Sequence, residues 1–406
     1  MAAALSISIL AFVAAGSWAN PGAREPARSS GTAVPESLLE RPVPLRHGIG
    51  NSHEAVSTRS PEAQAFFDQG LDYLEGYVWI EAARSFHQAL RLDPDLAMAY
   101  VGLSRTASGL SDRAAARNDL TRAKSLASKA SPRERRRIAL REKQLIAMDD
   151  PKNSRKFLAY KQAIDDALRL DAEPGLWLLR GNAEEPDASG RGQYGTEASI
   201  IYYRHILTLV PDYASAHHFL AHTYEGLGQI DSALAHGEAY SRLAPAIPHA
   251  AHMWGHALRR AARAKEAIAQ FERADSLERA YYASEHIDPT LDWHHAHNLA
   301  LLASMYRGNE MRSAPAAQDG NSVLDLEKKA ARARTDGRWK EAERDARAMI
   351  DIDPGYAGGH RALAQVFEHQ GRESRAALSL DLARRLRSNT ETALGDNRGG
   401  RPRASM

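Results

Sequence analysis

The chain has 406 residues, of which 43% are hydrophobic, 26% charged and 7% aromatic, the composition of an ordinary folded protein. Its 53 basic and 51 acidic residues leave a formal net charge of only +2, without the broad positive charge that a nucleic-acid-binding surface needs. It has no cysteine, which excludes disulfides, a cysteine-linked lipid anchor and cysteine-based zinc sites. We therefore expect no nucleic-acid partner.

Residues 1–19 have the pattern of a signal peptide. An apolar run from Ala2 to Ala15 precedes Ser17, Trp18 and Ala19, which place small residues where a signal peptidase requires them. The alternative is a membrane anchor, but the run is shorter than the ~20 residues of a spanning helix. We predict cleavage after Ala19, a periplasmic or secreted protein, and no stable membrane insertion after cleavage.

Two segments lack any sustained apolar period. Residues 20–45 are rich in Pro, Arg, Ser and Gly, and we predict that they form a flexible leader. Residues 388–406 have a similar composition and are predicted to be a disordered tail. The folded part of the chain is therefore expected between them.

A pattern recurs between these segments at a spacing of about 34 residues. Counting back from Pro94 places Gly70 at position 8 of one copy, Tyr73 at 11, Ala82 at 20 and Phe86 at 24. Small residues at positions 8 and 20 let the two helices of a hairpin approach closely, and the proline ends the second helix. This pattern is the signature of the tetratricopeptide repeat (TPR).

Further copies take their register from Pro245 and Pro354, and weaker copies fill the gaps. We predict an all-α fold, a right-handed TPR solenoid of about eight to nine helical hairpins with a concave groove. Its expected parts are an N-terminal TPR array with a histidine-rich groove over residues 46–310, a linker over 311–322 and a C-terminal TPR pair over 323–387.

Histidine is concentrated in the middle of this array. Twelve of the 17 histidines fall within 93 consecutive residues. The repeat register places His218 and His222 at positions 5 and 9 of one first helix, and His252 and His256 at the same positions of the next. These positions face the concave groove, and neighbouring helices lie about 8–10 Å apart. The four imidazoles are therefore predicted to converge on one point.

The functional interpretation of this cluster is a transition-metal site of the zinc or copper class, because imidazole suits these ions. Glu225 would act as a ligand, as a residue that orients a ligand, or as a general base. The predicted metal-binding residues are His218, His222, Glu225, His252, His256 and His297.

Three alternatives remain open at this point. The histidines could be structural groups that bond to one another and to the backbone. The groove could instead bind a protein or peptide in a metal-free adaptor, through His249, Arg259, Arg260, His294 and Asn298. A bound ion could also activate water or dioxygen in a metal-dependent enzyme. No nucleotide cofactor is expected, because no Walker or GxGxxG element stands between a strand and a helix.

Residues 47–310 also resemble a largely uncharacterised, histidine-rich family of exported bacterial TPR proteins. That family has clustered histidines before a Ser-Thr pair, then an HxxxH element, an HMPSH element and a His-Asn pair. The matching residues here are His53 before Ser57 and Thr58, then His218 and His222, then His252 and His256, then His297 and Asn298. The chain departs from the family pattern at Ser52 and Glu54, where the family has more histidine, and at Val78, Trp79 and Ile80, where it has Phe-Asn-His. The resemblance implies the TPR fold and export.

Overall fold

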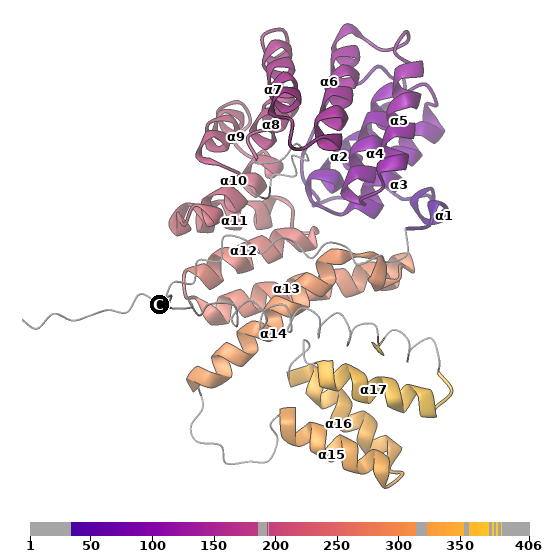
Figure 1. The fold of residues 1–406 in the computed structure, drawn as a ribbon, viewed down its shortest axis with the longest axis vertical. Coiled ribbons are helices and arrows are strands. Elements are labelled where there is room, and N and C mark those ends of the chain that lie inside the picture. The colour runs from indigo at the N-terminus through magenta and orange to yellow at the C-terminus, as the bar shows by residue number, and fades with distance from the viewer. Residues whose placement is uncertain are drawn as a thin grey trace, which may run out of the picture. The chain divides into compact units, whose positions relative to one another are not determined.

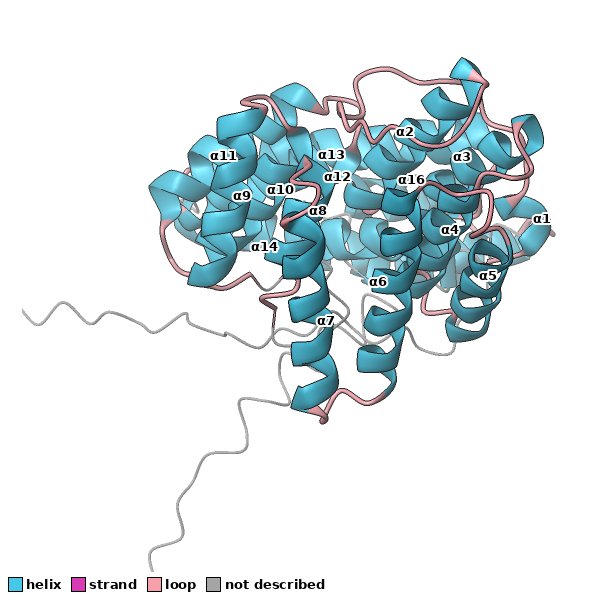
Figure 2. Cartoon of the chain, turned by 90° about the horizontal axis from the view of Figure 1, so that it is seen from above, coloured by secondary structure: helices cyan, strands magenta, loops and turns pink. Residues whose placement is uncertain are grey.

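The structure is a computed structural model that describes residues 34–185, 193, 195–313, 323–352 and 357–372, together with residues 376, 379, 380 and 383. The predicted signal peptide, residues 20–33 of the predicted leader, most of the predicted linker and the predicted tail lie outside the described residues. Figure 2 shows that the described residues form helices joined by loops, with no strand among them.

Most helices pack as hairpins with the next helix in the chain (Figure 1). A short helix, α1 (Glu36–Leu39), precedes them. The hairpins are α2 (Pro61–Glu75) with α3 (Trp79–Leu92), α4 (Ala97–Gly109) with α5 (Arg113–Ser125), α6 (Pro132–Asp149) with α7 (Ser154–Leu168), α8 (Pro174–Asn182) with α9 (Glu197–Leu209), α10 (Ala214–Gly226) with α11 (Ile230–Leu243), α12 (Pro248–Arg260) with α13 (Ala264–Glu285), and α15 (Val323–Thr335) with α16 (Trp339–Ile352).

Two helices open a repeat without a complete second helix in the described part of the chain. They are α14 (Trp293–Ser313), which follows the short 3₁₀ helix η1 (Pro289–Leu291) and packs on α13, and α17 (Ala357–His369). Nine first helices are thus described, in agreement with the eight to nine hairpins expected. No described helix combines the length and the apolar character needed to cross a membrane.

The backbone conformation of the turns within the hairpins recurs with the repeat period of 34 residues. Six of the described turns contain one residue with a positive φ, and these residues form three pairs spaced 34 positions apart: Tyr77 and Ser111, Gly228 and Ala262, Gly337 and Gly371. The next amide bonds back to the carbonyl five residues earlier, as in Val78 to Tyr73 at 2.9 Å, which is the Schellman closure of a helix end. The expected all-α TPR fold is confirmed.

Close helix packing explains the small residues of the repeat. A Cβ atom on Gly70 would lie 2.5 Å from the ring of Phe86, and one on Gly255 would lie 2.8 Å from the ring of Phe271. Both phenylalanines are fully buried between the two helices of their hairpin. Glycine at position 8 and phenylalanine at position 24 therefore form a matched pair in these two repeats.

Residues 34–45 correct the predicted flexible leader. They include α1 and the buried Val43, and they pack against the repeats. The backbone carbonyls of Arg41 and Pro42 both accept hydrogen bonds from the guanidinium of Arg84, at 3.1 and 2.6 Å. Contacts between residues more than 40 positions apart order this segment, and no local apolar period could reveal them.

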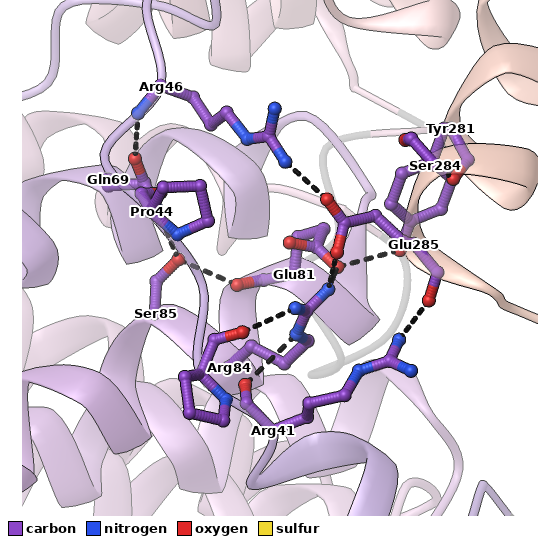
Figure 3. Close-up of polar contacts among 11 residues, drawn as sticks. Arg41, Pro44, Arg46, Gln69, Glu81, Arg84, Ser85, Tyr281, Ser284 and Glu285 are labelled. Carbon is purple, nitrogen blue, oxygen red and sulfur yellow. Dashed lines mark hydrogen bonds and ion pairs between the residues drawn. The ribbon is translucent and has the colours of Figure 1, made fainter.

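An ion-pair network joins the same segment to two distant helices (Figure 3). Arg84 on α3 pairs with Glu81 and, at 2.8 Å, with Glu285 at the end of α13. Arg46 also pairs with Glu285, and the Tyr281 hydroxyl donates to Glu81 at 3.0 Å. The network therefore holds α3 against the end of α13, about 200 residues later in the chain.

Candidate metal centre

Three successive first helices, α10, α12 and α14, bring seven histidines together. Their neighbouring ring centroids lie 4.6–6.0 Å apart. We call this group the histidine cluster; it consists of His218 and His222 on α10, His249, His252 and His256 on α12, and His294 and His297 on α14. His218 and His222, at positions 5 and 9 of α10, and His252 and His256, at the same positions of α12, all lie within this cluster.

The cluster lies in a poorly solvated environment. The residues His218, His249, His252 and His294 are at most 4% exposed. Burial, followed by the neighbouring imidazoles, lowers the pKa of His218, His249 and His252 well below the ordinary value. Burial likewise lowers the pKa of His222 and His297 to about 3. These imidazoles are neutral at neutral pH, which is the form that binds metal ions.

One end of the cluster is formed by His252, His256 and His297, which we call the C-terminal triad. One nitrogen from each ring lies within 4.8 Å of the other two. The Nδ1 of His256 lies 3.0 Å from Oε1 of Glu225, and its Nε2 is buried without a hydrogen-bond partner. His256 and His297 are half-buried, whereas His252 is buried.

Two neighbouring residues fix the orientation of the triad. The side-chain amide of Asn298 donates to the carbonyl of Phe271 at 2.9 Å, so its Oδ1 must accept a hydrogen bond from Nδ1 of His252 at 2.8 Å. Burial raises the pKa of Glu225, but the charge and hydrogen bond of His256 outweigh it and lower that pKa to about 2. The ionised Glu225 therefore accepts from Nδ1 of His256, and in the neutral tautomers with the proton on Nδ1 both His252 and His256 would present an unprotonated Nε2.

The other end of the cluster is formed by His218, His222 and His249, which we call the N-terminal triad. Its ligand atoms also lie within 4.8 Å of one another, and the Nε2 atoms of His222 and His249 are 3.1 Å apart. Both ring nitrogens of His218 are buried without a hydrogen-bond partner of good geometry. Tyr77, in the turn between α2 and α3, packs its ring on all three, with centroids 4.7–6.0 Å apart.

A chain of hydrogen bonds starts at the N-terminal triad. Nδ1 of His249 lies 2.9 Å from Nε2 of His294, and Nδ1 of His294 lies 2.5 Å from Oε1 of the buried Glu278. A cavity of roughly 70 Å³ borders these residues and is also lined by Tyr77, Glu81 and Tyr281. Glu81 and Tyr281 of the ion-pair network thus line the same cavity as His249 and His294 of the histidine cluster.

The structure groups the predicted metal-binding residues differently from the prediction. His218 and His222 share their space with His249, whereas His252 and His256 share theirs with His297, so the four imidazoles do not meet at one point. His249, His294 and Asn298, which we had assigned to a partner-binding groove, are buried inside the cluster. Of the two arginines assigned to the same groove, Arg260 is exposed and Arg259 is half-buried.

Sequence reasoning missed several residues of this centre. Tyr77 occupies a left-handed turn position at which five other repeats have Gly, Ala or Ser, and this unusual tyrosine could have been noticed in the repeat register. Glu278, Asp275 and His295 form a further group within 4.8 Å, in which Nε2 of His295 lies 2.8 Å from Asp275. Both acidic residues lie on a second helix, α13, where the repeat register predicts no groove position.

Comparison with known proteins gives only distant likenesses. The chain matches no protein-family model and no curated protein. It is similar to the human IFIT1 dimer with PPP-AAAA, at 15% identity and a TM-score of 0.41, over 80% of this chain and 73% of that one. PilW, a type IV pilus biogenesis factor, has 16% identity and a TM-score of 0.29, over 57% of this chain and 97% of PilW. A tetratricopeptide repeat protein from Parabacteroides merdae has 16% identity and a TM-score of 0.29, over 63% of this chain and 95% of that one. None of these likenesses bears on what the histidine cluster binds.

Proposed function

We propose that this TPR protein binds a transition-metal ion of the zinc or copper class in the C-terminal triad. His252, His256 and His297 would be the ligands, and Glu225 and Asn298 would orient two of them. The observation that carries the proposal is the buried, unpartnered Nε2 of His256 on a ring whose Nδ1 is held by a carboxylate.

Physical chemistry supports this assignment. A buried acceptor without a partner costs about 1–3 kcal/mol, and a coordinated ion would offset that cost. A carboxylate or amide on the far nitrogen fixes the ring tautomer and raises the basicity of the ligand, as in many histidine metal sites. Three imidazole nitrogen donors in a chain without cysteine favour zinc or copper over calcium or magnesium.

Two alternative functions would use the same residues, a metal-dependent enzyme and a metal-free adaptor. Three protein ligands leave a fourth position open, which is the arrangement of catalytic zinc sites, so a metal-dependent enzyme is the second candidate. Glu225 would not be its general base, because its carboxylate is engaged with the imidazole of His256. A metal-free adaptor is less well supported, because His249, His252 and His294 are at most 4% exposed and offer a peptide almost no surface. A protein partner elsewhere on the repeats is compatible with either function.

Export remains part of the proposal. It is supported by the pattern of residues 1–19 and by the resemblance to exported TPR proteins. Fusion of residues 1–25 to a reporter, with the Ala19 cleavage site intact or changed, would test it.

Metal binding is tested on the purified chain after chelation and dialysis. Zn²⁺ and Cu²⁺ affinities are measured by competition with a chromogenic chelator. We expect the wild type to bind at least one equivalent tightly, and the paired change His256→Ala and His297→Ala to remove one equivalent. The matched control is His236→Ala, which changes a half-buried histidine outside the cluster and should remove none. A wild type that binds no more tightly than the double variant would overturn the proposal.

A further inference from the structure

We infer that the histidine cluster holds two metal ions, and that His218, His222 and His249 bind the second. This inference rests on the proposed function, because both sites use neutral imidazole donors of one continuous cluster. The second ion would also be of the zinc or copper class, since its three donors are again nitrogens.

The spacing of the donor atoms supports the second site. Zn–N bonds are about 2.0–2.1 Å long, so two nitrogens on one ion lie about 3.0–3.5 Å apart. The Nε2 atoms of His222 and His249 are 3.1 Å apart, within that range. Two such nitrogens can also share a proton, so this distance needs a second observation.

His218 provides that observation. Its side chain is 0% exposed, and both of its ring nitrogens lack a hydrogen-bond partner of good geometry. Its ring is stacked on Tyr240, with centroids 4.6 Å apart and planes 13° apart, and meets Tyr77 edge-on at 4.8 Å. The ring is therefore held firmly by packing; one of its nitrogens contacts the backbone of Glu75, and the other has no protein partner, a combination that a coordinated ion would explain.

The ligand atoms of His249, His252 and His294 also lie within 4.8 Å of one another, but their hydrogen bonds leave this middle group without a third donor. His294 has both nitrogens engaged, one with His249 and the other with Glu278. His249 and His252 each have Nδ1 engaged, with His294 and Asn298 respectively, so each has only Nε2 to offer. His249 then serves the N-terminal triad and His252 the C-terminal triad. His294 and Glu278 act as positioning residues for His249, as Glu225 does for His256.

Tyr77 closes the second site. Its ring covers all three histidines of the N-terminal triad, and its side chain is only 5% exposed. Its φ of 62° is a costly conformation for a residue of this size, at roughly 1 kcal/mol or more. The first repeat thereby shields the second ion from water, whereas the C-terminal triad stays half-buried.

The number of ions bound tests the inference. Full-length protein is titrated with Zn²⁺ alone, and bound metal is counted by elemental analysis and native mass spectrometry. We expect two equivalents for the wild type, one for His222→Ala with His249→Ala, one for His256→Ala with His297→Ala, and none for all four changes. The control pair His217→Ala with His236→Ala should retain two, because these histidines bond to each other outside the cluster.

The outcomes separate the two proposals. A wild type that binds one ion, lost only when His256 and His297 are changed, would overturn the second site and leave the proposed function standing. A wild type that binds none would overturn both. Because a variant can fail to fold, circular dichroism accompanies each measurement. The number of ions bound by the wild type tests the second site without any variant. Loading with Cu²⁺ gives a further test. The two sites are neighbours in one cluster, with the rings of His249 and His252 5.6 Å apart, so two Cu²⁺ ions should couple and weaken the electron paramagnetic resonance signal per ion. A signal per ion equal to that of isolated Cu²⁺ would contradict the inference.

Discussion

Glu225 and His256 face each other across two neighbouring repeats, with 3.0 Å between Oε1 of the carboxylate and Nδ1 of the imidazole. Glu225 is at position 12 of its first helix and His256 at position 9 of the next, so the repeat itself sets the contact. The pair engages Nδ1 of His256 and leaves Nε2 as the nitrogen of that ring that could bind a ligand.

Replacing Glu225 should weaken metal binding at the C-terminal triad without removing it. We expect Glu225→Ala to lower the affinity about 10–100-fold, the usual effect of losing a residue that orients a ligand. Glu225→Gln should have a smaller effect, because its amide oxygen can still accept from Nδ1. Competition with a chelator gives the affinities. The control is Glu238→Gln on the exposed side of α11, and equal affinities for Glu225→Ala and this control would refute the assigned role.

The repeats were predictable from the sequence because their signals are local. Proline, small residues and aromatic residues recur within one hairpin, and the 34-residue spacing of the turns follows from them. The i, i+4 histidine pairs were predictable for the same reason. The pairing of His218 with His249 rather than with His252 was not, because it depends on how far one repeat is displaced along its neighbour. The roles of Tyr77 and Glu285 depend on contacts across more than 100 residues, which no repeat register contains.

Tyr77 should reverse the usual stability order of alanine and glycine. In a helix, glycine is less stable than alanine by about 1 kcal/mol, but at a positive φ glycine has no Cβ penalty. We therefore expect Tyr77→Gly to be more stable than Tyr77→Ala by about 1 kcal/mol in urea unfolding. Both variants should lose stability relative to the wild type, because a buried aromatic ring is removed.

The matched control for Tyr77 is Tyr73, which lies in the last turns of α2 and is also buried. There Tyr73→Ala should be more stable than Tyr73→Gly, the normal helical order. Finding the normal order at both positions would show that the left-handed turn at Tyr77 imposes no backbone cost.

The ion-pair network around Arg84 should be important for stability. Arg84 is 2% exposed and bonds to two carboxylates and two carbonyls. Arg84→Met would leave Glu81 buried without its cation, and breaking a buried pair in this way costs about 3–5 kcal/mol. Residues 41–46 should also exchange their amide hydrogens faster. Urea unfolding and hydrogen exchange measure these two effects.

Arg338 provides the comparison for Arg84. It also pairs with two carboxylates, Asp336 at 2.8 Å and Glu341, but its side chain is 46% exposed. Exposed pairs contribute at most about 1 kcal/mol, so Arg338→Met should change the unfolding free energy little. Similar losses for the two variants would mean that burial of the Arg84 network does not matter.

Asp72 gives the protein a pH dependence that does not involve the histidine cluster. Burial raises its pKa to about 7, with Asp68 and Glu75 adding to the shift and the amide of Ser52, at 2.8 Å, opposing it. In the unfolded chain the pKa is about 3.9, so between pH 4 and 7 the folded state binds more protons than the unfolded state. Stability must therefore fall as pH rises through this range.

Asp72→Asn removes this titration but keeps an oxygen that can accept from Ser52. The unfolding free energy of the variant relative to that of the wild type should rise by about 1–3 kcal/mol between pH 5 and pH 8, because over this range only the wild type gains a buried charge. Urea unfolding of chelator-treated protein at pH 5, 6.5 and 8 measures the difference. Asp95→Asn is the control, since Asp95 is 54% exposed and paired with Lys129, and its effect should change little with pH. A constant difference between Asp72→Asn and the wild type would show that Asp72 is already ionised at pH 5, because only a charge that appears between pH 5 and 8 makes the difference grow.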